Sequence, residues 1–479
     1  MTRRIVVVGG GISGLTAAYR IIREMGPGAV ELTLFEASQR FGGIIATDAS
    51  QGVVLEGGPD SFLRRKPEAV QLAQDLGLGR EIIGTNPNVR GSYIVHRGHF
   101  HDIPLGVRVG VPTRLDTLWT TELLSLAEKM RVWGDLILPR KPISSDVAVG
   151  TLMRYRFGNG YVDRIAAPML SGIYAGDIDR LSAQATVPAL LTYQARGRSL
   201  IREAEREAKK VPMSGDNSPK APSGLFVSLL RGVGSLVDAL VVALESKASL
   251  NRESPVQSIT YQSDGFVLTL RDGRTFEATD VVLAVPAYRA AQLLTFWDRD
   301  ARRLLTEIPY ADLAVIGAVY APSAFGRPLA RTGFLVPRGE GLEMTAATWV
   351  RSKWAYPDDV PLVPVRAFFG RADQQGLLDQ SDPTMMETFR REMGYIMGVT
   401  DEPRYTRVFR IPQGMPQYLV GHRERAHRIL NEAARWPGLK LVGSYFDGVG
   451  VPDCIRRANQ AAVEVAQAAR EPIHSPRST

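Results

Sequence analysis

An apolar strand, a glycine-rich turn and a helical pattern follow one another at the N-terminus, and this succession constrains the fold more than any other feature of the chain. The apolar run at 5–8 leads into Gly9-Gly10-Gly11-Ile12-Ser13-Gly14, and a second apolar strand at 32–35 ends on Glu36. This order is typical of a βαβ unit that binds a dinucleotide. We therefore predict a Rossmann-type domain here, with these seven residues in contact with the ligand.

Each position of the motif has a physical reason. Gly9 permits the tight turn, Gly11 lets the backbone approach a pyrophosphate, and Gly14 allows the helix and the strand to pack closely. The free N–H groups and the positive end of the helix dipole then face the phosphates. Glu36 is placed to accept a hydrogen bond from a ribose hydroxyl, and its charge disfavours the 2′-phosphate of NADP. The motif alone does not separate NAD from FAD.

The segments that follow favour FAD. Arg40-Phe41-Gly42-Gly43 resembles the second diphosphate contact of flavoproteins, and Gly57-Gly58-Pro59-Asp60 lets the backbone lie flat against a planar ring. Near the C-terminus a strand and a glycine-bearing turn lead into a long alanine-rich helix, whose N-terminus is a further anion site. The additional residues expected at FAD are Arg40, Gly42, Gly43, Gly57, Gly58, Pro59, Asp60, Val256, Val449, Gly450 and Val451.

Composition excludes several classes of protein. A chain of 479 residues predicts two or three domains, and one cysteine excludes a disulfide framework and favours a reducing cytoplasm. No stretch of about 20 residues is both apolar and uncharged, as a membrane-spanning helix requires. The net charge of +8 favours anionic partners, but the absence of a lysine- and arginine-dense tract argues against nucleic acid. The six histidines show no metal-binding spacing.

The pattern of apolar residues changes along the chain. Residues 107–138 are predicted to be largely helical, and helical periodicity continues through 147–157 and 161–170. This whole middle block is predicted to lack strands. Residues 211–224 are predicted to be a linker, and 225–244 a buried helix. Strand patterns then run from 256 to 285, and a second sheet is expected between 314 and 369.

The motifs taken together resemble the FAD-dependent porphyrinogen oxidases of haem biosynthesis, over nearly the whole chain. Besides the N-terminal motifs, the resemblance rests on Ser171-Gly172-Ile173-Tyr174-Ala175-Gly176-Asp177, Met415-Pro416-Gln417-Tyr418 and Gly448-Val449-Gly450-Val451-Pro452-Asp453-Cys454-Ile455. It implies a monoamine-oxidase-like fold of mixed α/β and α+β class. The implied parts are a discontinuous Rossmann-type FAD-binding domain (1–88, 224–290 and 437–479), a mixed-sheet substrate domain (89–108 and 291–436) and a helical domain with its linker (109–223).

The resemblance also implies the chemistry. Six hydrogens leave a porphyrinogen, non-covalent FAD receives hydride at its N5 atom, and molecular oxygen is the acceptor that yields hydrogen peroxide. No side chain is then needed as a catalytic nucleophile or base, and no metal is expected. The helix that begins near Val451 would stabilise reduced flavin through its dipole. In relatives the helical domain is linked to membranes, so peripheral membrane association of a cytoplasmic protein stays open, as does the oligomeric state.

Two branches of this family differ in their substrates, which carry two propionates in protoporphyrinogen and four in coproporphyrinogen. In the first branch an arginine on the hairpin before the helical domain pairs with a propionate, and Ser92 occupies that place here. The run 59–66 and the pair Thr348-Trp349 before Lys353-Trp354 resemble instead the Gram-positive coproporphyrinogen oxidases. By this resemblance Lys66 would contact a propionate. Ile173, Leu335 and Trp354 would contact the macrocycle.

Three alternatives remain open at this stage. The first is a protoporphyrinogen oxidase, and the second is another flavin amine oxidase-like enzyme or a carotenoid desaturase. The third is a non-enzymatic carrier on the same fold that has lost FAD. The basic charge balance is compatible with a tetra-anionic substrate but does not decide between these functions.

Overall fold

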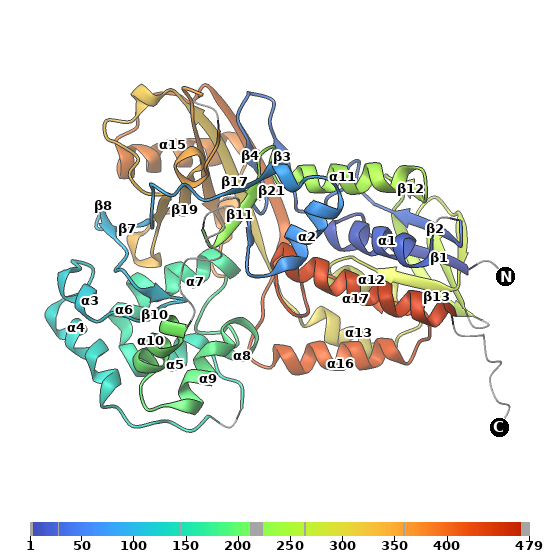
Figure 1. Ribbon diagram of the computed structural model, residues 1–479, viewed down its shortest axis with the longest axis horizontal. Helices are drawn as coiled ribbons and strands as arrows, with labels where there is room; N and C mark the ends of the chain where they lie inside the picture. The colour runs from blue at the N-terminus through green and yellow to red at the C-terminus, as the bar shows by residue number, and fades with distance from the viewer. Residues whose placement is uncertain are drawn as a thin grey trace.

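A computed structural model describes residues 3–26, 28–143, 145–210, 224–262, 265–357 and 360–470. Figure 1 shows a sheet with its helices around the N-terminus, a second sheet with α15 beside it, and a helical region below that second sheet. Segments far apart in the sequence meet in each part. The C-terminal helix α17 (Val451–Arg470), for example, packs on the N-terminal helix α1 (Ile12–Met25).

The sheet around the N-terminus has five strands, all parallel, in the order β12-β2-β1-β16-β22. Side chains alternate between its two faces, so that Ile5 and Val7 pack beneath α1 while Val6 and Val8 enter the core of the opposite face. The strands are β1 (Arg3–Val8), β2 (Val30–Phe35), β12 (Ser249–Asn251), β16 (Asp280–Leu283) and β22 (Leu439–Leu441).

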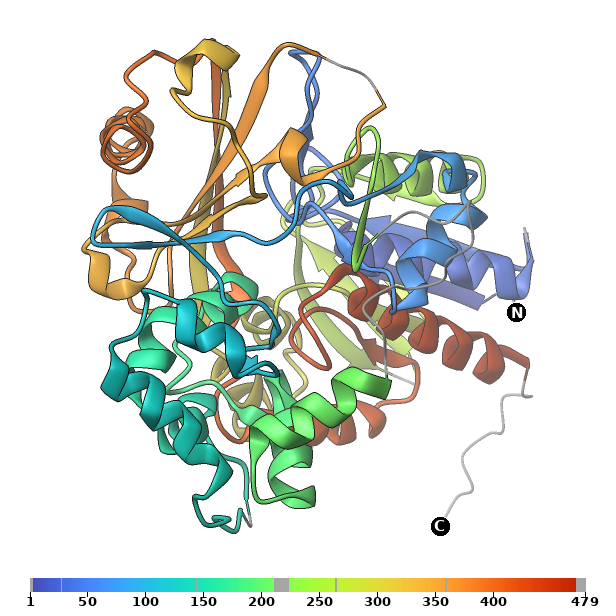
Figure 2. The same cartoon turned by 60° about the vertical axis from the view of Figure 1, so that its left-hand side comes forward.

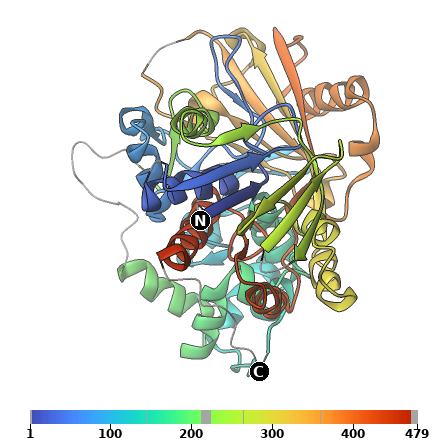
Figure 3. The same ribbon diagram turned by 90° about the vertical axis from the view of Figure 1, so that its right-hand side faces the viewer.

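Both faces of this sheet are covered, as its nearly continuous apolar strands require. One face packs against α1, α17, α2 (Pro67–Asp75) and α11 (Gly234–Glu245). The other packs against an antiparallel sheet and further helices, which Figure 3 shows from the side of the N-terminus. These elements are β13 (Val256–Gln262), β14 (Gly265–Leu270), β15 (Thr275–Ala278), α12 (Ala287–Leu293), α13 (Arg299–Thr306) and α16 (His422–Ala434).

The second sheet is mixed and has seven strands in the order β21-β17-β20-β19-β18-β7-β8, with only β18 and β7 parallel. The helix α15 (Asp382–Met397) packs on one face. The opposite face meets the hairpin of β3 (Thr47–Asp48) and β4 (Leu55–Glu56). The strands are β7 (Tyr93–His96), β8 (His99–Asp102), β17 (Tyr310–Tyr320), β18 (Gly333–Leu335), β19 (Met344–Trp349), β20 (Val363–Phe369) and β21 (Tyr405–Pro416), with the short helix α14 (Val350–Lys353) after β19.

The helical region packs around one core of its own and lies against the second sheet in Figure 2. It contains the two-stranded ribbon β9 (Val107–Arg108) and β10 (Val111–Pro112). Its helices are α3 (Asp116–Thr120), α4 (Leu126–Trp133), α5 (Val149–Phe157), α6 (Asn159–Tyr161), α7 (Ala167–Tyr174), α8 (Ala183–Thr186), α9 (Pro188–Arg196) and α10 (Leu200–Lys210).

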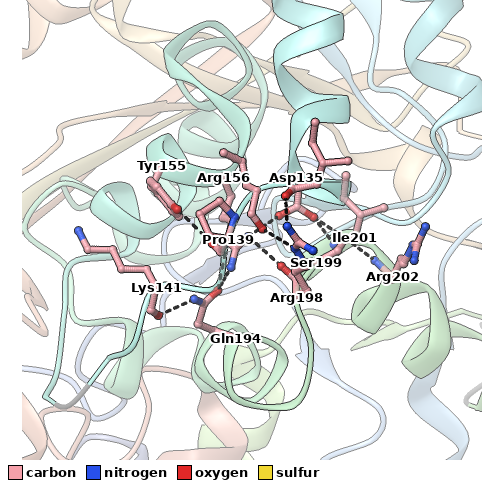
Figure 4. A network of polar contacts seen from close by, with 12 residues as sticks. Asp135, Pro139, Lys141, Tyr155, Arg156, Gln194, Arg198, Ser199, Ile201 and Arg202 are labelled. Atoms are coloured by element: carbon pink, nitrogen blue, oxygen red, sulfur yellow. Dashed lines mark hydrogen bonds and ion pairs between the residues drawn. The ribbon is translucent and has the colours of Figure 1, made fainter.

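A buried polar network, drawn in Figure 4, ties several of these helices together. Arg156 and Asp135 are both fully buried, with 3.4 Å between guanidinium and carboxylate. Arg156 also donates to Gln194, and Asp135 accepts from the Ser199 hydroxyl at 2.6 Å. Because each partner comes from a different segment, the network fixes the relative positions of α5, α9 and α10.

Two predicted elements differ from the structure. The segment 107–138 contains the β9–β10 ribbon before its helices begin, so the prediction of a block without strands was wrong. The segment 225–244 is not one helix, because β11 (Phe226–Leu229) pairs between β5 (Phe62–Leu63) and β6 (Ile82–Gly84) before α11 starts. The predicted linker lies outside the described residues except for Gly224. In the described part of the chain, no helix has the length and apolar character needed to cross a membrane.

Candidate active site

Two positions at the turn between β1 and α1, Gly9 and Gly14, have room for glycine only. Gly9 has φ +104°, and a Cβ atom there would lie 2.4 Å from the carbonyl oxygen of Ala284. A Cβ atom on Gly14 would lie 1.9 Å from the carbonyl oxygen of Gly9. By contrast, the space next to Gly11 is open, with Gly43 Cα at 3.9 Å. The first turn of α1 carries no acidic residue, so its N–H groups are available to an anion.

Glu36 lies at the end of β2, beside this turn. Its carboxylate accepts the Gly10 N–H at 2.6 Å and both the N–H and the hydroxyl of Ser38, at 2.8 Å and 2.7 Å. A carboxylate offers about four acceptor positions, so one remains for a ligand hydroxyl. The backbone carbonyl of Glu36 accepts from Ser254, two residues before Val256 begins β13. The Val256 side chain packs against the core on the far side of the parallel sheet.

The Arg40–Gly43 loop runs directly next to the first glycine turn. The Gly42 N–H donates to the carbonyl of Gly10 at 2.8 Å, and Gly11 and Gly42 form an isolated β-bridge. The guanidinium of Arg40 donates to the carbonyls of Ile45 at 2.7 Å and Gly43 at 2.6 Å. Arg40 therefore braces the loop from within, which sequence reasoning did not foresee, and keeps further N–H donors for a ligand.

The loop 57–60 is held from the second sheet. Arg366 on β20 is 1% exposed and donates to the carbonyls of Glu56 and Gly58, both at 2.6 Å. It also lies 2.8 Å from the carboxylate of Asp60, which Lys353 contacts at 2.7 Å. Burial raises the pKa of Asp60, but the two cations outweigh it, so the pKa lies well below its usual range. Asp60 thus belongs to an ion network that joins the loop 57–60 to the second sheet.

Glu56 is a second buried acid of this loop, with a different environment. Its carboxylate accepts from the Thr47 hydroxyl and the Val233 N–H, both at 2.5 Å. Burial raises the pKa of Glu56 to about 7, against the lowering effect of these hydrogen bonds. The group holds the β3–β4 hairpin against the start of α11.

The N-terminus of α17 comes close to the N-terminus of α1. The carbonyl of Gly450 accepts the N–H groups of Asp453 and Cys454, so the helix starts immediately after the loop 443–450. Burial raises the pKa of Cys454 to about 12, against the effect of a hydrogen bond with Ser13 of α1. Two helix N-termini with positive dipole ends therefore face one region, with Val449, Gly450 and Val451 along its edge.

These observations test whether the residues fit a long dinucleotide such as FAD, and they do. The glycine turn at α1 leaves bare backbone for a pyrophosphate, and Glu36 retains an acceptor for a ribose. A ligand that begins at this turn would next meet the loop 57–60 and the start of α17. A mononucleotide would leave this second half unused.

The residues predicted to contact a substrate fall into two groups. Ile173 on α7 is half exposed although it is apolar, and a Cβ atom on its neighbour Gly172 would lie 3.8 Å from Leu335. Leu335 therefore lies beside the residue that precedes Ile173. Trp354 is 2% exposed and has the Lys353 ammonium 4.8 Å from its ring centre, so its indole is packed in protein.

Lys66 has a partner that the sequence did not suggest. Its ammonium lies 2.7 Å and 2.6 Å from the two carboxylate oxygens of Asp453, a buried residue in the first turn of α17. Lys66 itself is one-third exposed, and its third N–H donor remains. Ser92, at the place of the arginine in protoporphyrinogen oxidases, shares a hydrogen bond of 2.8 Å with Thr332.

Sequence reasoning missed Arg366 and Lys353 as parts of the site. A signal was present for Arg366, because a charged residue interrupts the apolar strand 363–369 where a buried strand should have none. Lys353 gave no such signal, since a lysine before a tryptophan is ordinary at a surface.

Comparisons with known proteins agree with this geometry. The sequence profile of the flavin containing amine oxidoreductases matches residues 12–466. The coproporphyrinogen III oxidase of Bacillus subtilis (strain 168) is 33% identical over 96% of this chain and 97% of its own. The chloroplastic protoporphyrinogen oxidase 1 of Arabidopsis thaliana is 28% identical over 97% and 88%. A crystal structure from Exiguobacterium sp. 255-15, of a protein assigned as a protoporphyrinogen oxidase, is 32% identical with a TM-score of 0.85 over 98% of this chain and 99% of that one.

Proposed function

The chain belongs to the family of flavin containing amine oxidoreductases, and from that premise we propose that it oxidises coproporphyrinogen III to coproporphyrin III with FAD and molecular oxygen. The observation that carries the proposal is the full-length relation to coproporphyrinogen III oxidases, combined with a cradle that fits FAD. The monoamine-oxidase-like fold supports it. The place of the reaction in haem biosynthesis follows from the product.

FAD would be held by three glycine loops and two helix N-termini. The residues we propose for it are the turn 9–14, Glu36, Arg40 with Gly42 and Gly43, the loop 57–60, and the loop 449–451. Val256, two residues after the Ser254 that donates to the Glu36 carbonyl, would contribute its backbone, since its side chain packs elsewhere. Bound flavin supplies a hydride acceptor at N5, which dioxygen re-oxidises with release of hydrogen peroxide.

The side chains of this chain would bind and orient the reactants, and we assign none of them as the base for the proton that the substrate loses with each hydride. The half-exposed Ile173, with Leu335 beside the preceding Gly172, would present an apolar wall on which a macrocycle can lie. Lys66 would provide an ammonium group at the start of α17 for a propionate. The positive end of the α17 dipole favours the negative charge that accompanies reduction. We also propose that the FAD-binding, substrate and helical domains have the bounds predicted from the sequence.

The test is a two-substrate assay in air with purified protein. Initial rates are measured by porphyrin fluorescence for coproporphyrinogen III and protoporphyrinogen IX, and hydrogen peroxide is assayed alongside. We expect a higher kcat/KM for the four-propionate substrate. A clear preference for the two-propionate substrate would refute the substrate assignment, and colourless protein without flavin absorbance would support the carrier alternative.

Protoporphyrinogen IX oxidation is the second candidate, because the relation to the Arabidopsis enzyme also extends over most of both chains. Ser92 weighs against it. The hydroxyl of Ser92 is paired with Thr332 and cannot supply the positive charge that a propionate would meet at an arginine.

Peripheral contact with a membrane is a separate part of the proposal. Six large apolar side chains between residues 105 and 137, in the helical region or just before it, are at least 44% exposed, which is unusual for large hydrophobic residues in adjacent segments. They are Leu105, Val109, Trp119, Leu126, Met130 and Ile137. Co-sedimentation with vesicles of anionic lipid tests it, and absence of binding at low salt contradicts it.

A further inference from the structure

The chain segment just after β21 contacts both halves of the site through two consecutive side chains. Tyr418 is 1% exposed, and its hydroxyl accepts the Gly448 N–H at 3.1 Å and donates to the Ser444 carbonyl. Both backbone groups belong to the loop between β22 and α17. The Tyr418 hydroxyl gives its one donor to Ser444 and uses an acceptor position for Gly448. It therefore ties together both ends of the five-residue turn 444–448.

Gln417 contacts the opposite side. Its side-chain amide donates to the carbonyl of Tyr174 at 3.0 Å and to that of Met415 at 3.2 Å. Tyr174 is the last residue of α7 and follows Ile173, the residue proposed to face the macrocycle. Gln417 is 3% exposed, so water cannot easily replace this bond.

Neighbouring contacts make the segment rigid. The ring of His422 stacks on Tyr418 with 4.0 Å between centroids and 12° between planes. Burial lowers the pKa of His422 to about 4, so the ring is neutral near pH 7 and packs as an aromatic group. The Ser182 N–H donates to the Tyr418 carbonyl at 2.8 Å, which attaches the helical region to the same point.

We propose that Tyr418 and Gln417 are positioning residues, Tyr418 for the flavin loop before α17 and Gln417 for the α7 wall of the substrate site. Consecutive residues of an extended segment point to opposite sides, so one peptide unit sets the distance between cofactor and substrate. Both side chains are buried, so we assign them positioning roles rather than contacts with a reactant. The inference rests on the proposed function, because it assumes flavin at α17 and a macrocycle at α7.

The two roles predict different losses, which matched variants separate. Tyr418→Phe removes one oxygen, and Gln417→Leu removes the amide at similar volume. Tyr161→Phe is the control, because its buried hydroxyl has no partner among the described residues and it lies in the helical core. Each purified holoenzyme is measured for FAD dissociation, flavin midpoint potential, thermal midpoint, and KM for coproporphyrinogen III.

We expect Tyr418→Phe to weaken FAD binding about tenfold, the effect of losing one buried hydrogen-bond partner, and to shift the midpoint potential with little change in KM. Gln417→Leu should raise KM about tenfold and leave FAD binding unchanged, and Gln417→Met repeats the test if the first variant folds poorly. The proposal is overturned if both variants have lower thermal midpoints but keep wild-type FAD binding, flavin midpoint potential and KM. It is also overturned if the two variants change every readout equally. If wild type turns over neither porphyrinogen, the proposed function fails, while the FAD arm still tests Tyr418.

Discussion

Replacing Lys66 by alanine tests how this residue contributes to the site. In the structure its ammonium contacts both oxygens of Asp453, at 2.7 Å and 2.6 Å, and has one donor left. A hydrogen bond to a charged group contributes about 1.5–3 kcal/mol when buried, and the partial exposure of Lys66 reduces this to about 1.4 kcal/mol. If that bond is made to a propionate, Lys66→Ala raises KM for coproporphyrinogen III about tenfold with kcat little changed.

The same substitution also leaves the buried Asp453 carboxylate with Arg456, at 3.1 Å, as its remaining ion-pair partner in the described chain. A double-mutant cycle separates the two effects. If Lys66 acts only by pairing with Asp453, adding Asp453→Asn to Lys66→Ala restores KM to the value of Asp453→Asn alone. If Lys66 contacts substrate, KM stays raised. Steady-state kinetics in air measure all four proteins, with the exposed-lysine variant Lys247→Ala as the control. An unchanged KM in Lys66→Ala, or its recovery in the double mutant, refutes the contact.

Three further predictions concern the cofactor cradle and the buried charges. Gly14→Ala should abolish flavin binding, because the new Cβ would lie 1.9 Å from the carbonyl oxygen of Gly9. The readout is the loss of flavin absorbance near 450 nm. The control Gly339→Ala, at a position with open space, should bind flavin normally. The folded-state pKa of Glu56 is raised to about 7 from 4.5, so its contribution to stability is complete below pH 4.5 and lost as pH rises through 7. The free energy of unfolding of wild type, measured by chemical denaturation, should therefore fall relative to that of Glu56→Gln between pH 4.5 and 7. A difference between the two proteins that stays constant over this range would contradict the raised pKa. Burial lowers the pKa of Arg371 to about 10, and its Nε and Nη1 have no hydrogen-bond partner among the described residues. Arg371→Met should therefore raise the free energy of unfolding by about 1 kcal/mol. A lower thermal midpoint in this variant would count against the prediction.

The geometry of the first glycine turn was predictable because its signal is local. The glycine positions of the first turn depend on contacts within β1, α1 and the adjacent strand β16, and the spacing of those glycines records the constraint. The same holds for the α17 start, where a glycine-bearing turn precedes a long helix. The fold class followed from the family resemblance that these motifs carry.

What sequence reasoning missed depends on pairings between distant residues. The segment 225–244 is apolar throughout, and periodicity cannot separate a short buried strand from a helix in such a run. The strand β11 forms because β5 and β6, more than 140 residues earlier, leave a place between them. Gly232, with φ +89°, marks the turn after the strand. The ion pair of Lys66 with Asp453 spans 387 positions and left no trace near either residue.

The opening motif is therefore not sufficient to build the site. Arg366 is 310 positions from Glu56 and holds two carbonyls of the loop 57–60 and its flanks, besides the carboxylate of Asp60. If the second sheet packed on this loop without Arg366 and Lys353, the loop would keep a buried acid with no cation and carbonyls with no donor, which costs more free energy than a short loop can recover. The same contacts thus complete the loop 57–60 and its junction with the second sheet, so the cofactor site should form only when this loop has docked on that sheet.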